Sequence, residues 1–262
     1  MKKNHIYQWP DYYDWTSDGL DGDMAYYANL AMESGGPVLE LGCGTGRCSL
    51  GVARHGIEVV GVDKQPEMIE VAEKKAHAMD LSHRCQWICG DMTDFDLEKK
   101  FPLVMIPYRS FLHLLSIRDQ LAALQKVREH LTDDGVFAFN VFVPNVSQLV
   151  EEDERYVCRG NFFIPGTDES VDVYDYTEFD FFHQRASITR YYERFASDGM
   201  SLSRLRTNFS IRYIFPAELF HLLHVGGFQI IHRYGGFRRE PFGPGSSELV
   251  VEARKRKKRG SA

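Results

Sequence analysis

Hydrophobic and polar positions follow two different patterns along the chain. Between residues 38 and 143, short apolar runs alternate with longer amphipathic stretches. Apolar runs separated by helix-length segments are typical of buried parallel strands joined by helical crossovers. The pattern predicts strands at 38–41, 56–62, 86–89, 103–106 and 136–143.

Helices are expected between these strands and before the first one. Pro66 suits the first turn of a helix that ends near Met79, and Ser116 is a candidate N-cap. The Asp133-Asp134-Gly135 triplet predicts a turn before the fifth strand. The other two helices are expected at about 21–34, before the Gly35-Gly36-Pro37 break, and at about 46–55.

From about residue 145 to residue 210 the pattern becomes an alternation of apolar and polar residues. Residues 171–176 and 186–195 alternate as half-buried antiparallel strands do, and Asp198-Gly199 predicts a hairpin turn. The earlier pattern then returns, with a helix from Pro216 to Val225 and strands at 228–232 and 248–253. The middle segment is therefore interpreted as an insertion into one domain.

The chain is accordingly divided into four parts. The fold expected is an α/β domain over 36–144 and 211–253, with an N-terminal aromatic and helical cap over 1–35. The insertion at 145–210 is predicted to be an antiparallel lid, with aromatic side chains on one face and acidic ones on the other. That aromatic face would cover the ligand or, alternatively, form a dimer interface. The basic tail at 254–262 is expected to be disordered, since like charges repel.

Composition narrows the possible partners. The formal net charge is −6 and the isoelectric point is near 5.9, which gives no overall electrostatic footprint for nucleic acid. No apolar segment has the length of a signal peptide core or a membrane span. The five cysteines lack zinc-site spacing. We expect a cytoplasmic protein, monomer or homodimer, with reduced thiols and without metal, membrane or nucleic-acid partners.

The glycine-rich stretch after the first strand carries the chemistry. Gly42, Gly44 and Gly46 allow a tight turn and close approach of a ligand to the backbone. Asp63 follows Gly42 by 21 residues (63 − 42), at the end of the second strand, where a carboxylate can bind both hydroxyls of a ribose. Arg47 occupies the place of the third glycine in the dinucleotide fingerprint, which disfavours a nicotinamide cofactor. Glu40 could attract a cationic group of another nucleoside ligand.

Four segments in this order resemble the motifs of class I S-adenosylmethionine-dependent methyltransferases. They are residues 38–47 (VLELGCGTGR), 62–69 (VDKQPEMI), 89–92 (CGDM) and 106–114 (IPYRSFLHL). The resemblance implies a Rossmann-like seven-stranded sheet of order 3-2-1-4-5-7-6, with strand 7 antiparallel. The lid after strand 5 resembles the glycine and amino-sugar N-methyltransferases.

The resemblance also implies a cofactor, S-adenosyl-L-methionine, which becomes S-adenosyl-L-homocysteine on reaction. Asp91 would accept a hydrogen bond from the adenine amino group, and Met92 would pack on the ring. The residues implied in cofactor binding are Glu40, Gly42, Cys43, Gly44, Gly46, Asp63, Lys64, Met68, Asp91, Met92 and Pro107.

The predicted activity is methylation of a small molecule, by in-line transfer to an amine. His113, Tyr13 and Tyr108 are the candidates for orienting or deprotonating the acceptor. The alternatives are a small-molecule O-methyltransferase, a nucleic-acid or protein methyltransferase, and a non-catalytic S-adenosylmethionine-binding protein. The nucleic-acid alternative is disfavoured because strand 4 ends in Ile106-Pro107-Tyr108-Arg109 rather than in Asn/Asp-Pro-Pro-Tyr/Phe.

Overall fold

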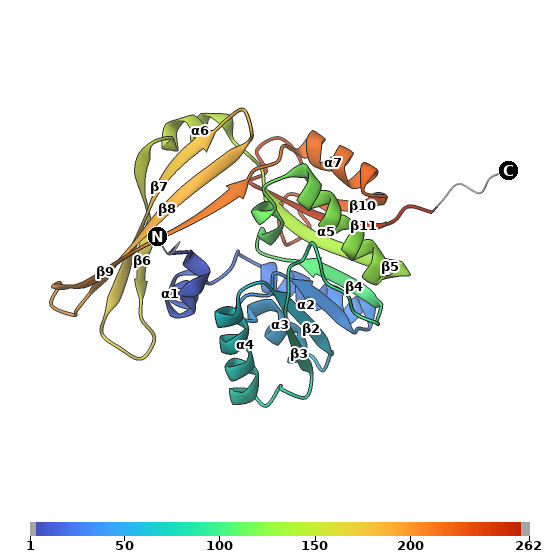
Figure 1. Cartoon of the computed structure of the whole chain (residues 1–262), viewed down its shortest axis with the longest axis horizontal. Helices are drawn as coiled ribbons and strands as arrows, with labels where there is room; N and C mark the ends of the chain where they lie inside the picture. Colours follow the sequence, from blue (N-terminus) through green and yellow to red (C-terminus); the bar gives the residue numbers. More distant parts are fainter. Residues whose placement is uncertain (1–3, 258–262) are drawn as a thin grey trace. The chain divides into compact units, whose positions relative to one another are not determined.

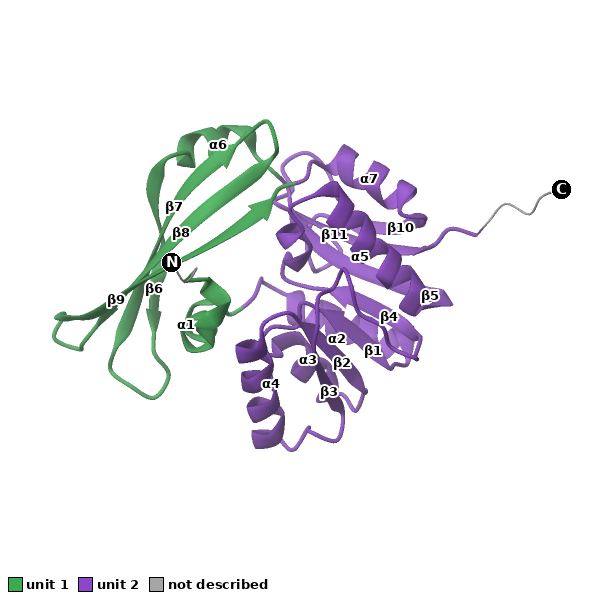
Figure 2. Ribbon diagram, viewed as in Figure 1, with its two compact units in different colours: residues 1–18, 144–213 green, residues 19–143, 214–262 purple. Residues whose placement is uncertain are grey.

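The structure is a computed structural model that describes residues 4–257 of the chain. It separates into two compact units, coloured differently in Figure 2. Unit 1 comprises Met1–Asp18 and Pro144–Tyr213, and unit 2 comprises Gly19–Val143 and Ile214–Ala262.

Unit 2 contains a seven-stranded sheet of order β10-β11-β5-β4-β1-β2-β3. Counted along the chain within this sheet, that order is 3-2-1-4-5-7-6. The strands pair in parallel from β3 through β5, whereas β11 is antiparallel to both of its neighbours. The predicted fold class is confirmed. The strands are β1 (Val38–Leu41), β2 (Val59–Asp63), β3 (Cys85–Cys89), β4 (Phe101–Ile106), β5 (Leu131–Phe142), β10 (Phe228–Tyr234) and β11 (Glu248–Lys255).

Helices cover both faces of this sheet (Figure 1). Tyr27 and Leu30 of α2 pack with Val52 of α3 against Val38 and Leu103 of the sheet. The opposite face carries α5 and α7 (Figure 1). The helices are α2 (Asp23–Ser34), α3 (Arg47–Ala53), α4 (Pro66–Ala78), α5 (Ile117–His130) and α7 (Pro216–Val225).

The local sequence explains where these helices begin. Pro66 and Pro216 stand in the first turns of α4 and α7, where their missing N–H groups would have no partner in the helix. Ser116 is the N-cap of α5, and its hydroxyl oxygen accepts a hydrogen bond of 3.1 Å from the backbone N–H of Asp119. The predicted starts of all three helices agree with the structure.

The turn predicted before the fifth strand corresponds to an irregularity within β5. β5 begins at Leu131, directly after α5. Leu131 pairs with Phe101 of β4, and both side chains are fully buried, whereas the next paired residues are Val136 and Leu103. Residues 132–135, which include the predicted turn, therefore leave the pairing with β4, while the buried Leu131 extends the strand before them.

Unit 1 contains a four-stranded sheet of order β6-β7-β8-β9, antiparallel throughout. The turn at Asp198-Gly199 joins β8 to β9 as expected, with Gly199 at φ +83°. The elements are η1 (Ile6–Gln8), α1 (Pro10–Thr16), α6 (Val146–Glu152), β6 (Arg155–Phe163), β7 (Ser170–Asp180), β8 (Arg185–Phe195) and β9 (Ser201–Arg212).

The N-terminal segment packs on one face of the unit 1 sheet. Ile6 joins Val171, Val173 and Tyr192 in a buried cluster, against which Tyr12 and other aromatic side chains pack. This cluster is the hydrophobic core of unit 1.

The expected separation of aromatic and acidic side chains onto opposite faces is wrong. Asp175 lies on the same face as the core, where Arg159 and Arg190 donate hydrogen bonds to its carboxylate at 2.7 to 3.0 Å. Tyr156 and Tyr176 occupy the opposite face, with ring centroids 5.1 Å apart. Two guanidinium groups compensate the buried carboxylate, so charge is tolerated on the core face.

The unit boundaries differ from the predicted domains. The helix expected within the N-terminal cap is α2, which belongs to unit 2 because Tyr27 and Ala31 are fully buried in that core. Residues 144–213 form a compact unit together with the N-terminal segment.

The basic tail is partly ordered, contrary to expectation. Arg254 and Lys255 belong to β11 and pair with Gln229 and Phe228. The backbone ladder therefore outweighs the repulsion between like charges in this part of the tail. Residues 258–262 of the predicted tail lie outside the described residues.

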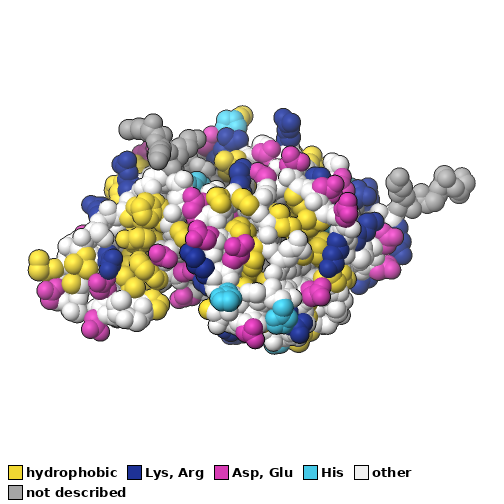
Figure 3. Space-filling model, turned by 60° about the horizontal axis from the view of Figure 1, so that its bottom comes forward, with side chains coloured by type: hydrophobic (Ala, Val, Ile, Leu, Met, Phe, Trp, Pro, Cys, Tyr) yellow, Lys and Arg dark blue, Asp and Glu magenta, His cyan; other side chains and the backbone are white. Residues whose placement is uncertain are grey.

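The described surface carries both signs of charge. Basic and acidic side chains are interspersed on the face shown in Figure 3. Over residues 4–257, no helix has the length and apolar character needed to cross a membrane. Within the same residues, no group of three or more histidine, cysteine, aspartate or glutamate side chains has a metal-binding arrangement.

Candidate cofactor site

The chain turns back sharply after β1. The N–H groups of Gly42 and Cys43 both donate to the carbonyl oxygen of Val62, at 2.8 and 3.1 Å. Gly46 has a φ of +83°, and a Cβ there would lie 2.7 Å from the ring of Trp87. A larger residue at position 46 would therefore clash and be strained. These contacts fix the loop against the end of β2.

Gly44 is half-buried and has open space beside its backbone. A Cβ at Gly44 would meet no atom within 4 Å, whereas Gly42 and Gly46 are both closely packed. Because the N-terminus of α3 follows directly, the N–H groups that begin this helix favour an anionic ligand group. The loop thus leaves backbone accessible next to a helix N-terminus.

Asp63 connects the loop to β2. Its Oδ2 accepts a hydrogen bond of 2.8 Å from the Gly44 N–H, and its Oδ1 accepts one of 2.9 Å from the Gln65 N–H. Burial raises the pKa of this carboxyl group, and these two hydrogen bonds oppose the increase. Each carboxylate oxygen has a second lone pair, so the group can still accept from two hydroxyls. The arrangement fits a ribose.

Glu40 lies in the interior beneath the loop. Its side chain is buried, and Oε2 accepts a hydrogen bond of 2.5 Å from the hydroxyl of Ser49 on α3. Burial raises the pKa of Glu40 to about 8, although the Ser49 hydrogen bond and the charge of Arg47 oppose the increase. A cationic ligand group nearby would favour ionisation of this carboxyl group.

Lys64 and Asp91 form an ion pair between the ends of β2 and β3. Lys64 Nζ lies 2.7 Å from Asp91 Oδ2, while Asp91 Oδ1 accepts from both the N–H and the hydroxyl of Thr93. Partial burial acts to raise the pKa of Asp91, but the hydrogen bonds from Lys64 and Thr93 outweigh it and lower the pKa. Met92 lies beside Gly42, with Cε 3.3 Å from the position of a Cβ there.

Cys43, Met68 and Pro107, which are implied in cofactor binding, are buried in unit 2, as Glu40 is. Met68 is 1% exposed and Cys43 is 5% exposed. The Cys43 sulfur lies close to Gly61, and burial raises the pKa of its thiol well above the ordinary value. Pro107 is buried after β4. The side chains of Cys43 and Met68 pack beneath the loop. This geometry favours a role in supporting the loop over direct contact with a ligand.

The segment after β4 has an unusual backbone. Tyr108 and Arg109 have φ values of +55° and +64°, and the short helix η2 (Ser110–His113) follows. Two successive non-glycine residues in the left-handed region are uncommon and concentrate at functional sites. This segment places Tyr108 and His113 at the carboxyl edge of the sheet, where ligands of such folds bind.

A chain of polar contacts holds Arg109. Its guanidinium group donates to Glu248 on β11, with Nε 2.7 Å from Oε1. The other Glu248 oxygen accepts a hydrogen bond from Asn140 Nδ2 at 3.1 Å, and Asn140 Oδ1 accepts one from Tyr27 at 3.0 Å. The pattern of apolar residues gave no indication of this chain, because its members come from four distant segments.

Arg47 has a role that the motif analysis missed. It forms a two-pronged ion pair with the buried Asp23 of α2, at 2.9 and 2.5 Å, and its guanidinium carbon lies 5.2 Å from the centre of the Tyr108 ring. Arg47 therefore links the glycine loop to α2 and to the segment after β4. One sign of this role is visible in the sequence, because Arg47 occupies the place of the third glycine in the dinucleotide-binding fingerprint.

Tyr13 belongs to unit 1, unlike the other candidate residues. It lies in α1, where its ring is 5.7 Å from that of Tyr7. His113 ends η2 in unit 2 and is half-buried. Unit 2 alone therefore carries Glu40 and Asp63 near the ends of β1 and β2, and Asp91, Tyr108 and His113 on the connections that follow β3 and β4.

Comparison with known proteins identifies methyltransferases as relatives of this chain. A family model described as a methyltransferase domain matches residues 38–135. A putative methyltransferase, YqeM of Bacillus subtilis (strain 168), is 26% identical over 67% of this chain and 77% of its own length. The glycine/sarcosine N-methyltransferase of Parasynechococcus marenigrum (strain WH8102) is 25% identical over 89% of this chain and 77% of its own length.

Solved structures share the fold over nearly the whole chain. The CcbJ methyltransferase of Streptomyces caelestis has a TM-score of 0.81, with 24% identity and 97% of each chain covered. CalS10, an amino pentose methyltransferase of Micromonospora echinaspora with S-adenosylmethionine bound, has a TM-score of 0.70 and 16% identity, with 97% of this chain and 100% of CalS10 covered.

The sheet order, the glycine loop and the family match together define the class I methyltransferase fold. Residues 38–135 form a methyltransferase domain, and the protein is an S-adenosylmethionine-dependent methyltransferase.

Proposed function

We propose that the protein transfers a methyl group to the amine of a small molecule. The observation that carries this proposal is the similarity to a glycine/sarcosine N-methyltransferase over 89% of the chain. That similarity extends beyond residues 38–135, which match the methyltransferase family model. The structural similarity to an amino pentose methyltransferase likewise covers 97% of the chain.

The cofactor would be held on the connections after β1, β2 and β3. Asp63 would accept hydrogen bonds from the ribose hydroxyls, and the backbone at Gly44 would lie against the ligand. Glu40 would stabilise the cationic amino group from beneath the loop, while Asp91 and Met92 would flank the adenine. Lys64 would hold the Asp91 carboxylate in place through their 2.7 Å ion pair.

The bound cofactor supplies a methyl group already activated by the positive charge of its sulfonium. The protein must therefore align an uncharged amine nitrogen with that methyl, and such positioning can lower the barrier by about 7–11 kcal/mol. The nitrogen–carbon bond forms as the carbon–sulfur bond breaks, and the nitrogen then loses a proton. Within unit 2, Tyr108 and His113 are the proposed residues for orienting the amine or accepting that proton.

A matched set of acceptors tests this proposal. Glycine, sarcosine and a 3-amino sugar would be compared with glycolate and the corresponding hydroxy sugar, with S-adenosylhomocysteine release and product mass as readouts. The proposal predicts release with at least one amine and a product heavier by one methylene group. Methylation of the hydroxy compounds alone would overturn the choice of nitrogen, and it would leave the methyltransferase class intact.

A further inference from the structure

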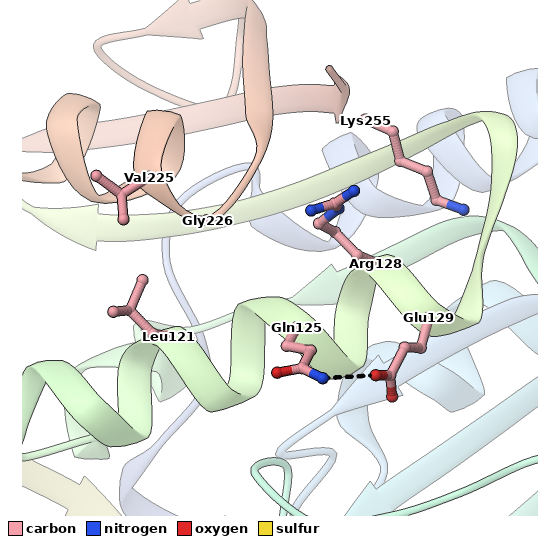
Figure 4. Close-up of a pocket in the computed structure, with 7 residues that line it drawn as sticks. All are labelled: Leu121, Gln125, Arg128, Glu129, Val225, Gly226 and Lys255. Carbon is pink, nitrogen blue, oxygen red and sulfur yellow. Dashed lines mark hydrogen bonds between the residues drawn. The ribbon is translucent and has the colours of Figure 1, made fainter. Parts of the chain in front are cut away.

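A hollow of about 560 Å³ lies between α5, α7 and β11 in unit 2 (Figure 4). Leu121 of α5 and Val225 and Gly226 at the end of α7 form one part of its lining. Arg128 of α5 and Lys255 of β11 form another part. The volume is that of a pocket for a small molecule.

This hollow is separate from the cofactor site. Along β11 the paired residues of β5 fall from Phe142, opposite Glu248, to Phe137, opposite Ala253, so β11 runs toward the start of β5. Because β5 runs parallel to β1 and β2, the end of β11 lies toward the edge of the sheet opposite the glycine loop. A ligand here would not occupy the cofactor's position.

Arg128 is held in a prepared position beside the hollow. Its guanidinium group contacts Gly227 and fills the space that a side chain at Gly227 would need. Its Nε is buried and has no hydrogen-bond partner among the described residues.

The neighbouring acidic groups do not neutralise this guanidinium. Glu129 accepts a hydrogen bond from Gln125 at 2.8 Å and pairs with Lys126 at 3.3 Å. Lys255 is only 17% exposed, and its ammonium lies 3.5 Å from Asp133, whose side chain is 95% exposed. Arg128 of α5 and Lys255 of β11 both line the hollow (Figure 4). The region therefore has an excess of positive charge.

We propose that this hollow binds a small molecule that carries an oxyanion, either a carboxylate or a phosphate. Arg128 and Lys255 bind the oxyanion, since a guanidinium group matches the geometry of both groups. The apolar part of the ligand packs against Leu121 and Val225. No ligand site of the proposed methyl transfer includes these residues, so the inference stands independently of the acceptor.

Calorimetric titration with benzoate, phenyl phosphate and phenol tests the proposal in the presence of saturating S-adenosylhomocysteine. Benzoate or phenyl phosphate should bind in the millimolar range or more tightly, and phenol should bind more weakly than either. The preferred anion distinguishes a carboxylate ligand from a phosphate ligand. Absence of anion binding, or equal binding of phenol, would overturn the proposal.

Three variants locate the binding. Arg128→Gln and Lys255→Gln should each weaken the preferred anion by about tenfold or more, as expected for loss of a hydrogen bond to a charged group. Lys257→Gln is the matched control, because Lys257 is 90% exposed and does not line the hollow. Equal weakening by all three variants would indicate nonspecific attraction to the basic end of the chain and would overturn the site.

Discussion

The two units use carboxylate groups in opposite ways. In unit 2, Asp63 stands at the end of a strand and each of its oxygens accepts from a backbone N–H. In unit 1, Asp175 stands in the middle of β7 and accepts from two arginine side chains on the neighbouring strands β6 and β8. Asp63 keeps lone pairs that can accept hydrogen bonds from a ligand at the carboxyl edge of a parallel sheet. The Asp175 carboxylate is instead bound by the two arginine side chains within the protein.

Removing the Asp175 carboxylate should have the largest effect on stability. Asp175→Ala leaves Arg159 and Arg190 without their shared partner, and Arg190 is 18% exposed. Loss of one partner from a buried ion pair should lower the free energy of unfolding by about 3–4 kcal/mol. Chemical denaturation measures this loss. Asp172→Ala is the control, because Asp172 is on the other face of β7 and its hydrogen bond to Asn161 is exposed.

The affinity of Asp175→Ala for S-adenosylhomocysteine tests whether the carboxylate of unit 1 has any part in cofactor binding. If unit 2 alone holds the cofactor, folded Asp175→Ala should bind S-adenosylhomocysteine as the wild type does. A large loss of affinity in the folded variant would show that the unit 1 network contributes to the cofactor site.

Glu40 should make stability depend on pH. Its pKa is about 8 in the folded protein, well above the ordinary value of about 4.3. The folded state therefore retains a proton that the unfolded chain releases, and stability should fall as pH rises from about 5 to about 8. The loss attributable to Glu40 should be on the order of 3 kcal/mol. Denaturation of Glu40→Gln should show a flatter profile; parallel profiles would contradict the assignment.

Asp63→Ala should weaken the cofactor complex more than it weakens the fold. Loss of a charged acceptor should cost about 1.5–3 kcal/mol of binding free energy, measured by calorimetry with S-adenosylhomocysteine. Asp134→Ala is the control, since Asp134 is 90% exposed and lies in the first half of β5. Unchanged affinity in folded Asp63→Ala would refute the ribose assignment.

Glu248→Gln should have the smallest effect on stability, about 1 kcal/mol, because the Arg109 side chain is 39% exposed. It should nevertheless lower kcat, since Arg109 and the adjacent Tyr108 lose their anchor. Glu252→Gln on the same strand is the matched control, because Glu252 accepts from Tyr26 and not from Arg109. Equal kcat values for the two variants would exclude a positioning role for Glu248.

The amino-acid sequence predicted those features of the fold that depend on interactions between residues close together in the chain. Ser116 and the prolines of α4 and α7 act within a few residues of their own positions, so the local pattern indicated where these helices begin. The sheet order was implied by the resemblance of four segments to class I methyltransferase motifs. Contacts between distant segments were not predictable. The Asp175 network joins three strands, and the Tyr27–Asn140–Glu248–Arg109 chain joins α2, β5, β11 and the segment after β4. The pairing of Leu131 with Phe101, which begins β5 before the predicted turn, likewise joins two distant segments.

The most direct test of the central claim is a calorimetric comparison of S-adenosylhomocysteine with NAD on the wild-type protein and on Asp63→Ala. The account predicts micromolar binding of S-adenosylhomocysteine to the wild type, weaker binding to the variant and no binding of NAD to either. Tight binding of NAD without binding of S-adenosylhomocysteine would contradict it.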